Sequence, residues 1–325
     1  MNQSRYYFSL FALWSALFLI WHSPVEAAYP ERTVRIVVST GPGGGADLLA
    51  RVVASKLQEI WSQPVVIDNR PGGNGTIGLA TVVHAKPDGY TLALYSSLQA
   101  DAPLLNKLDF DAINGIEPIS VVAIQPDILV VNSSLPARSM KELIALAKAS
   151  PGKLKYGTAG VAVQSTFALE LLKKEAGVDI LQVSYKQGWV EALLRGDEIQ
   201  MFYMGIASSL EQIKAGNFRA LAVSGNSRAA LLPDVPTMTE ATGLSGFENT
   251  GNFYGIAAPK GTPDEIINKV NEGLVAAVND PAVKATLLKM GFQAGANKPK
   301  EFDKMIREEN AKWAPIVKSL GLEPQ

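Results

Sequence analysis

The stretch Val34-Arg-Ile-Val-Val-Ser-Thr-Gly-Pro-Gly-Gly-Gly-Ala-Asp-Leu48 decides the fold of this chain. It starts as a β-branched apolar run typical of a buried strand, and it passes through a turn with four glycines. It then continues as a helical pattern made by Leu49, Val52, Val53 and Leu57. A strand, a glycine turn and a helix start together present free backbone amide groups and the positive end of a helix dipole. An anion therefore fits at this turn.

Apolar runs of the same kind recur through the chain after residue 28, and they alternate with helical patterns. This alternation predicts an α/β fold with largely parallel sheets. The expected strands are residues 34–39, 65–68, 91–95, 119–123, 128–131, 154–157, 180–183, 199–203, 218–223 and 253–257.

Several helix starts also carry local signals. Ser139 with Glu142, and Thr237 with Glu240, have the spacing of capping boxes. Asp280 before a proline predicts another helix start. These signals are structural and indicate no function.

The end of the chain predicts how the domains are arranged. Residues 262–320 show helical patterns only, so we expect three helices there with no strand between them. Helices that follow the last strand must cover a sheet already built, so we expect them to pack back onto the first domain. The chain is also long for one hydrophobic core. We therefore predict a first domain of residues 28–125 and 253–325, with a second domain, residues 126–252, inserted between them.

The N-terminus has the pattern of a secretory signal peptide. Arg5 precedes an apolar run over residues 6–21, and Val25-Glu-Ala27 before Ala28 offers small residues for cleavage. The alternative is a membrane anchor, but the run is shorter than the roughly 20 residues that span a bilayer. We predict that residues 1–27 are removed and that the mature protein is periplasmic.

The composition argues against catalysis. The chain has no cysteine, which excludes disulfides, a thiol nucleophile and zinc-thiolate sites. Of its two histidines, His22 lies in the predicted signal peptide, so only His84 remains, at a helix end where a solvated or capping role is the usual one. The net charge of −1 gives no reason to expect a nucleic-acid partner. We expect no enzyme activity, no metal site and no cofactor.

Two further glycine turns follow predicted strands. The first is Asn69-Arg-Pro-Gly-Gly-Asn-Gly-Thr76. The second is Tyr156-Gly-Thr-Ala-Gly160, which comes shortly before the helical run that starts near Gln164. Because open α/β sheets bind ligands at the carboxyl ends of their strands, three amide-rich helix starts at a shared cleft make a site for a carboxylate.

A dinucleotide site is the alternative for the first turn. Gly41-Pro-Gly-Gly-Gly-Ala46 matches the G-x-G-x-x-G/A pattern, and Asp68 ends the next strand where a ribose-binding acid would lie. The pattern is loose, however, and Asp68 is followed directly by another glycine turn. The predicted export also removes the chain from the cytoplasmic nicotinamide pool, so we favour the carboxylate.

Many ordered motifs resemble the Bug-type (Bordetella uptake gene) receptors, the extracytoplasmic solute receptors of tripartite tricarboxylate transporters. The resemblance covers nearly the whole chain after the predicted signal peptide. It rests on Tyr29-Pro30, Pro42-Gly-Gly-Gly-Ala-Asp47, Asn69-Arg-Pro-Gly-Gly-Asn-Gly75, Lys86-Pro-Asp-Gly-Tyr-Thr91, Tyr156-Gly157, Tyr185-Lys186, Ile213-Lys-Ala-Gly216, Leu232-Pro-Asp-Val-Pro-Thr237 and Ala258-Pro-Lys-Gly-Thr-Pro263.

This resemblance implies a periplasmic Venus-flytrap fold with two α/β domains and a hinge of crossing strands near residues 125–127 and 252–254. It implies a carboxylate ligand held by loop amides, hydroxyls and waters, and a large and a small membrane permease subunit as partners. By position, the ligand contacts would be Pro42, Gly43, Gly44, Gly45, Ala46, Asp47, Gly72, Gly73, Asn74, Gly75, Thr76, Thr158, Ala159, Gln164, Ser165 and Thr166.

The departures from the family pattern bear on the ligand. Members often carry Ser-Thr-x-His where this chain has Val163-Gln-Ser-Thr166, and an Asp where it has Met204. After Tyr185-Lys186 the usual small residues give way to Gln187-Gly-Trp189. We hypothesise an apolar, partly aromatic wall that suits an aromatic carboxylate such as terephthalate, with Trp189 or Tyr203 stacking on its ring. The alternative is that Trp189 and Met204 are ordinary core residues.

Two other functions stay open at this point. A periplasmic sensor that passes its ligand signal to another protein would have the same receptor fold. An exported hydrolase would need a base, for which only His84 is available, and the chain has no G-x-S-x-G nucleophile elbow.

Overall fold

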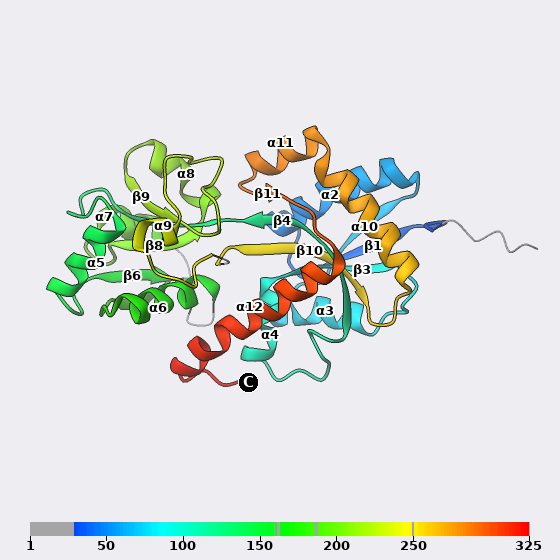
Figure 1. Ribbon diagram of the computed structural model, residues 1–325, viewed down its shortest axis with the longest axis horizontal. Coiled ribbons are helices and arrows are strands. Elements are labelled where there is room, and N and C mark those ends of the chain that lie inside the picture. Colours follow the sequence, from blue (N-terminus) through cyan, green and yellow to red (C-terminus); the bar gives the residue numbers. More distant parts are fainter. Residues whose placement is uncertain (1–28, 159, 161–162, 186–187, 249, 325) are drawn as a thin grey trace, which may run out of the picture.

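The computed structural model describes residues 29–158, 160, 163–185, 188–248 and 250–324. Two sheets lie side by side, each with helices on its faces, and long strands run between them (Figure 1). We call each sheet with its helices a lobe. The expected fold of two α/β domains is confirmed. The residues of the predicted signal peptide lie outside the described part of the chain.

The first lobe is built on a six-stranded sheet with the order β11-β4-β10-β3-β1-β2. Its strands are β1 (Val34–Val38), β2 (Val65–Asn69), β3 (Thr91–Ser96), β4 (Ile116–Gln125), β10 (Asn252–Pro259) and β11 (Gln293–Ala294). Its helices are α2 (Gly45–Trp61), the short 3-10 turn η1 (Gly73–Gly75), α3 (Thr76–Val83), α4 (Ser97–Leu105), α10 (Asp264–Asn279), α11 (Pro281–Lys289) and α12 (Pro299–Ser319).

The second lobe is built on a five-stranded sheet with the order β7-β6-β8-β5-β9. Its strands are β5 (Asp127–Asn132), β6 (Lys155–Thr158), β7 (Leu181–Ser184), β8 (Met201–Gly205) and β9 (Phe218–Val223). Its helices are α5 (Met140–Ala149), α6 (Gln164–Ala176), α7 (Trp189–Arg195), α8 (Ile206–Lys214) and α9 (Met238–Thr242).

The sheets are mixed, so the expectation of largely parallel sheets is wrong for the strands that connect the lobes. Strand β1 is parallel to β2 and β3, and β6 is parallel to β7 and β8. In contrast, β10 is antiparallel to both of its neighbours, and so is β5. The reason is that β10 enters the first sheet from the second lobe, opposite to the direction in which β3 and β4 run.

The end of the chain also differs from its prediction in two ways. A two-residue strand, β11, lies between α11 and α12 and pairs with β4, although no strand was expected there. Two residues are too short to give a periodic pattern. Helix α12 packs Phe302 and Ile306 into the first lobe, but its later residues Trp313, Ile316 and Val317 belong to the core of the second lobe. We expected the C-terminal helices to pack back onto the first domain; the first half of α12 does so, and its second half packs on the second lobe.

The predicted helix caps agree with the structure in most details. Thr237 and Glu240 form a complete capping box, and the Asp280 carboxylate accepts hydrogen bonds from the next turn of backbone amides. Ser139 accepts from the Glu142 amide at 3.2 Å, but the Glu142 carboxylate accepts from the Arg138 amide and not from the Ser139 amide. This box is therefore only half formed.

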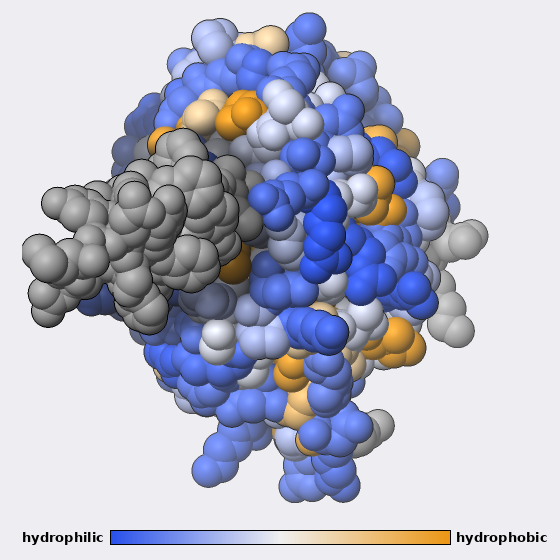
Figure 2. Space-filling model, turned by 90° about the vertical axis from the view of Figure 1, so that its right-hand side faces the viewer, coloured by the Kyte–Doolittle hydropathy of each residue, from blue (hydrophilic) through white to orange (hydrophobic). Residues whose placement is uncertain are grey.

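Figure 2 shows the outer end of the first lobe, where hydrophilic residues cover most of the surface. In the part of the chain that the structure describes, no helix is both long and apolar enough to span a membrane.

A substitution at Gly255 tests how closely β10 is packed against its neighbours. A Cβ atom at this position would lie 2.3 Å from the Phe302 ring and 2.6 Å from the backbone oxygen of Ser120. We expect Gly255→Ala to lower the free energy of unfolding by about 1–3 kcal/mol, because the backbone oxygen cannot move aside. Urea denaturation followed by circular dichroism measures this change. Gly295→Ala is the control, since nothing lies within 4 Å of its Cβ position. Equal stability of the two variants would contradict the prediction.

Candidate functional site

The carboxyl ends of the first lobe's parallel strands lie next to the strands that cross between the lobes. Ser96, at the end of β3, is paired with Tyr254 near the start of β10, and Asn252 is paired with Gln125 at the end of β4. Helices α2, α3 and α4 begin where β1, β2 and β3 end. Their N-termini therefore lie along the edge of the sheet that faces the crossing strands.

The second lobe presents the same kind of edge. Strands β6, β7 and β8 are parallel, and Gly205 at the end of β8 is paired with Asp127, the first residue after the crossing from β4. Helices α6, α7 and α8 follow these strand ends. The two edges thus flank the crossing strands, and we call the region between them the lobe junction. It is the place where open α/β sheets bind ligands.

The helix starts at the lobe junction lack side-chain caps. The N-cap residues of α2, α3, α6 and α8 are Gly44, Gly75, Val163 and Gly205, and none of them gives a side-chain hydrogen bond to its helix. Helix α4 is the exception, because Ser96 and Gln99 form a capping box that the sequence analysis missed. The short helix α7 also starts without a side-chain cap, at Gly188. Since first-turn amides need a partner, these uncapped helix starts with their dipoles favour an anion at this junction.

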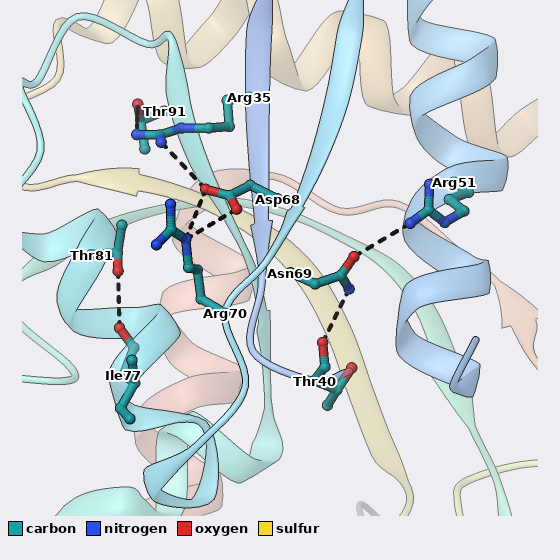
Figure 3. A network of polar contacts seen from close by, with 9 residues as sticks. All are labelled: Arg35, Thr40, Arg51, Asp68, Asn69, Arg70, Ile77, Thr81 and Thr91. Carbon is teal, nitrogen blue, oxygen red and sulfur yellow. Dashed lines mark hydrogen bonds and ion pairs between the residues drawn. The ribbon is translucent and has the colours of Figure 1, made fainter. Parts of the chain in front are cut away.

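Asp47 lies behind the first glycine turn and holds it in place. Its carboxylate accepts hydrogen bonds from the Gly43 amide, the Arg51 guanidinium and the Asn69 side chain, each at 2.9 Å. Asn69 also donates to the Thr40 carbonyl, so it links β2 to the turn (Figure 3). The Arg51 hydrogen bond lowers the pKa of Asp47 to about 2, despite burial. Asp47 thus stabilises the glycine turn, because its carboxylate oxygens already accept hydrogen bonds from the protein.

The remaining residues of this turn are more accessible. Pro42 and the three glycines Gly43, Gly44 and Gly45 are exposed, and Ala46 is half-buried. Thr40, which the sequence analysis did not single out, has a buried hydroxyl oxygen without a hydrogen-bond partner. Its position between the strand and the glycines was the one signal that could have identified it.

The carboxylate that the dinucleotide hypothesis assigns to the ribose already forms ion pairs with arginines. Asp68 contacts Arg35 at 3.3 Å and Arg70 at 3.0 Å (Figure 3). A ribose hydroxyl would have to compete with two guanidinium groups. The structure therefore favours the carboxylate alternative for the first turn.

The second turn requires its glycines. Gly72, Gly73 and Gly75 have positive φ angles, from 57° to 123°, which glycine adopts without strain. Asn74 between them has φ 51°, in the left-handed region that asparagine also visits. The Thr76 hydroxyl donates to the Gly73 carbonyl at 2.7 Å and closes the turn. Within the turn, the Gly75 amide donates to the Gly72 carbonyl at 3.0 Å and the Thr76 amide donates to the Gly73 carbonyl.

The third turn uses its hydroxyl groups internally. Thr158 and Thr166 are fully buried, their hydroxyls lie 2.6 Å apart, and both contact the Gly160 carbonyl. Gln164 points away from the turn and donates from its side-chain amide to Glu309 of α12. Ser165 is half-buried, and Ala159 lies outside the described residues. The two threonines therefore fix the shape of the turn.

The three residues of the hypothetical aromatic wall have different surroundings. Trp189 is half-buried at the start of α7, with its ring centroid 4.7 Å from that of Phe202. Tyr203 is 1% exposed, and its hydroxyl lies 3.1 Å from that of Thr250. Met204 is buried in the core on the other face of the sheet. Of the three, Trp189 is the side chain that combines a place at the edge with partial exposure.

No catalytic constellation surrounds His84. This exposed residue ends α3, its Nδ1 lies 2.9 Å from the Ala80 carbonyl, and its ring contacts Phe110. It has the capping role that the sequence predicts. Among the described residues, no group of three or more His, Cys, Asp and Glu side chains is arranged to hold a metal ion.

Comparisons with known proteins agree with this geometry. Residues 49–322 match the family model for the tripartite tricarboxylate transporter family receptor. Protein BugT from Bordetella pertussis is 33% identical over 304 residues, which cover 92% of this chain and 93% of BugT. The structure of an R. palustris protein with adipate has a TM-score of 0.74 and 31% identity, covering 91% of this chain and 100% of that one. MatC from Rhodopseudomonas palustris with bound malate has a TM-score of 0.70 and 27% identity, covering 89% and 100%.

The Asp47 contacts predict a pH-dependent stability. Because its pKa is lowered in the folded state, Asp47 contributes stability above its ordinary pKa of about 4, and this contribution is lost as the pH falls through about 2. We expect Asp47→Asn to be less stable than the wild type near neutral pH, and the difference in urea midpoint to narrow between about pH 5 and pH 2. Asp109→Asn, at an exposed acid, is the control. A difference for Asp47→Asn that does not change with pH would count against this role.

Proposed function

The chain belongs to the tripartite tricarboxylate transporter receptor family, whose Bug-type members are periplasmic solute receptors and not enzymes, and we propose that it captures a small organic carboxylate at its lobe junction. The observation that carries this proposal is the set of uncapped helix starts on the two facing sheet edges. Relatives with adipate and with malate support a carboxylate as the ligand.

The distribution of amides favours a ligand with two carboxylates. The helix starts of α2 and α3 belong to the first lobe, and those of α6 and α8 belong to the second. An acid with a carboxylate at each end would satisfy both edges when the lobes come together, whereas a single carboxylate would leave one edge without an anion. We therefore propose a dicarboxylate.

We further propose that the body of the ligand is aromatic, as in terephthalate. The half-buried Trp189 ring, packed on Phe202 at the second lobe's edge, supports this idea, because an aromatic ligand would extend the stack. The burial of Tyr203 and Met204 restricts this contribution to Trp189. The alternative, in which Trp189 only fills the core with Phe202, predicts no preference for aromatic acids.

The wider role of the protein is also a proposal. Residues 1–27 would direct export, and the ligand-loaded receptor would deliver its carboxylate to membrane permease subunits. Residues 28–125 and 253–325 would form one domain and residues 126–252 the other, with the second half of α12 packed on the inserted domain. A periplasmic sensor is the second candidate, because it would use the same receptor fold; co-purification with a permease subunit or with a sensor protein distinguishes the two. A hydrolase has no support beyond His84.

A titration with a panel of acids tests the ligand proposal. We expect isothermal titration calorimetry to give a lower Kd for terephthalate than for benzoate, glutamate and citrate, with adipate between, because two carboxylates and a ring match the two edges and Trp189. Binding without any chemical change in the recovered acid is part of the expectation. If citrate alone binds tightly, the aromatic proposal is wrong; if no acid binds, the carboxylate proposal is wrong.

Trp189→Ala tests the aromatic contact directly. A stacking contact is worth about 0.5–1.5 kcal/mol, so we expect the Kd for terephthalate to rise by about 2- to 10-fold. The Kd for adipate should change less, because adipate has no ring, and Trp189→Phe should keep most of the affinity. Circular dichroism checks that the variants are folded. Equal losses for both acids would assign Trp189 to the core and not to the ligand.

A further inference from the structure

The chain passes between the lobes at three places within the described residues. Strand β4 leads into β5 through Pro126, and Gly251 leads into β10. The third passage is the middle of α12, where the helix leaves the first core at Ile306 and enters the second at Trp313 (Figure 1). Any change in the angle between the lobes must bend the chain at these three points.

Buried carboxyl groups lie at the first and the third of these passages, and on α4, the helix that packs against α12. Asp127 directly follows Pro126 and is 3% exposed. Glu309 lies between Ile306 and Trp313 and is also 3% exposed. Asp101 of α4, a helix that packs against α12, is 4% exposed. Burying an ionised carboxylate is costly unless cations or hydrogen-bond donors surround it.

The three carboxyl groups differ in the number of hydrogen-bond donors that contact them. Glu309 accepts from the Gln164 side chain, from the Trp313 indole at 2.8 Å and from Lys312 at 2.8 Å. Within the part of the chain that the structure describes, the Asp127 carboxylate has one long contact, 3.5 Å from the Asn252 side-chain amide, and one oxygen of Asp101 has no hydrogen-bond partner. The ion pair with Lys312 stabilises Glu309 as an anion, whereas neither Asp101 nor Asp127 forms an ion pair within the described residues.

We propose that the hinge holds a proton on Asp127 while the lobes are in the arrangement described, and that it releases this proton when the lobes separate. Closure over the ligand is thus coupled to proton uptake. This inference rests on the proposed function, since it is the ligand that holds the lobes together.

The groups that face Asp127 and Asp101 favour their neutral forms. Burial raises the pKa of Asp127 to about 8, and the negative charge of Glu309 on α12 adds to this. Tyr203 of β8 and Tyr254 of β10 also face Asp127; burial raises the pKa of both tyrosines, to about 12 for Tyr254, so they stay neutral.

Asp101 has similar surroundings on the other side of Glu309. Burial and the Glu309 charge raise the pKa of Asp101, while Lys312 opposes the shift. Tyr95 of β3 faces Asp101, and burial raises the pKa of this tyrosine as well. Asp101 is therefore the second group able to hold a proton at this hinge, and Glu309 links it electrostatically to Asp127.

A groove gives this region a route to solvent. It has a volume of about 410 Å³ and lies between the crossing strands and α12. Pro126, Ser224, Gly251, Glu309 and Lys312 are among the residues that line it. The Ser224 hydroxyl accepts a hydrogen bond from the Asp127 amide at 2.8 Å, so the groove reaches the residues next to Asp127. Water in this groove can exchange protons with the hinge.

The raised pKa of Asp127 determines whether ligand affinity rises or falls with pH. Below about pH 4 both arrangements hold the proton, so this group causes no pH dependence. Above that pH the separated lobes lose the proton first, and the closed arrangement keeps it up to about pH 8. Ligand affinity should therefore fall as the pH rises within this window, and it should be constant where Asp127 cannot ionise.

The experiment uses the full mature chain, with terephthalate and adipate as ligands, both mainly dianions between about pH 6 and pH 8. We expect the wild-type Kd to rise at least about 3-fold over this range, and calorimetry in phosphate and in Tris to show net proton uptake. Asp127→Asn mimics the protonated acid, so its Kd should be lower than that of the wild type from pH 6 upward, change by less than about 2-fold with pH, and show no proton uptake. Asp109→Asn is the control and should behave like the wild type. Ligand binding without proton uptake in the wild type overturns the proposal.

A second measurement needs no ligand and separates this inference from the ligand proposal. If Asp127 is neutral when folded and ionised when unfolded, the urea midpoint of the wild type should fall relative to Asp127→Asn as the pH rises from about 5 to 8. Asp101→Asn provides the same test at the neighbouring group, in case Asp127→Asn does not fold. If none of the acids binds but the urea midpoints of the wild type and Asp127→Asn diverge with pH, the ligand proposal is wrong and the proposed proton on Asp127 is supported. Midpoints that stay parallel overturn the hinge proposal, whatever the ligand result.

Discussion

The antiparallel pairing of β10 between β3 and β4 is the interaction on which the rest of the structure depends. Because β10 returns from the second lobe and pairs in register with the ends of both neighbours, it places Ser96, Gln125 and the first residues of β10 at one edge of the sheet. The parallel strands β1 and β2 end at the same edge. The helix starts that follow them must then face the second lobe, whose own parallel strands end at the crossing from the other side.

This geometry explains how an anion can be held without a cation from a side chain. The first-turn amides of α2, α3, α6 and α8 lack side-chain caps, whereas the starts of α9 and α11 are capped by Thr237 and Asp280. Asp47 and Asn69 fix the first glycine turn in shape before any ligand arrives. Donors that are already in position lose little entropy on binding, so a receptor of this kind can bind a carboxylate and still release it.

Polar contacts cross the hinge beside the apolar packing of α12 on the second lobe. Ser97 donates to Asn252, and Asn252 in turn contacts Asp127, so one chain of polar contacts runs from the first lobe to the second. At the third passage, Glu309 accepts hydrogen bonds from the side chains of Gln164, Lys312 and Trp313. Apolar packing would resist separation through lost surface burial, whereas these groups can exchange partners with water. Movement between the lobes is therefore less costly at this layer than within either core.

The sequence by itself determined the elements, the glycine turns and the family, because these depend on local spacing: apolar periodicity, glycines that allow positive φ, and motifs in a fixed order. It did not determine the antiparallel direction of β10, the short strand β11 or the second half of α12, since these depend on which distant segment supplies a partner. It also did not show in which direction the side chains of the candidate site point. Asp47, Thr158, Thr166 and Gln164 all lie in the predicted turns, yet their polar atoms bind other parts of the protein. Position along a turn is a local property, but the direction of a side chain is set by the neighbours that only the tertiary structure brings to it.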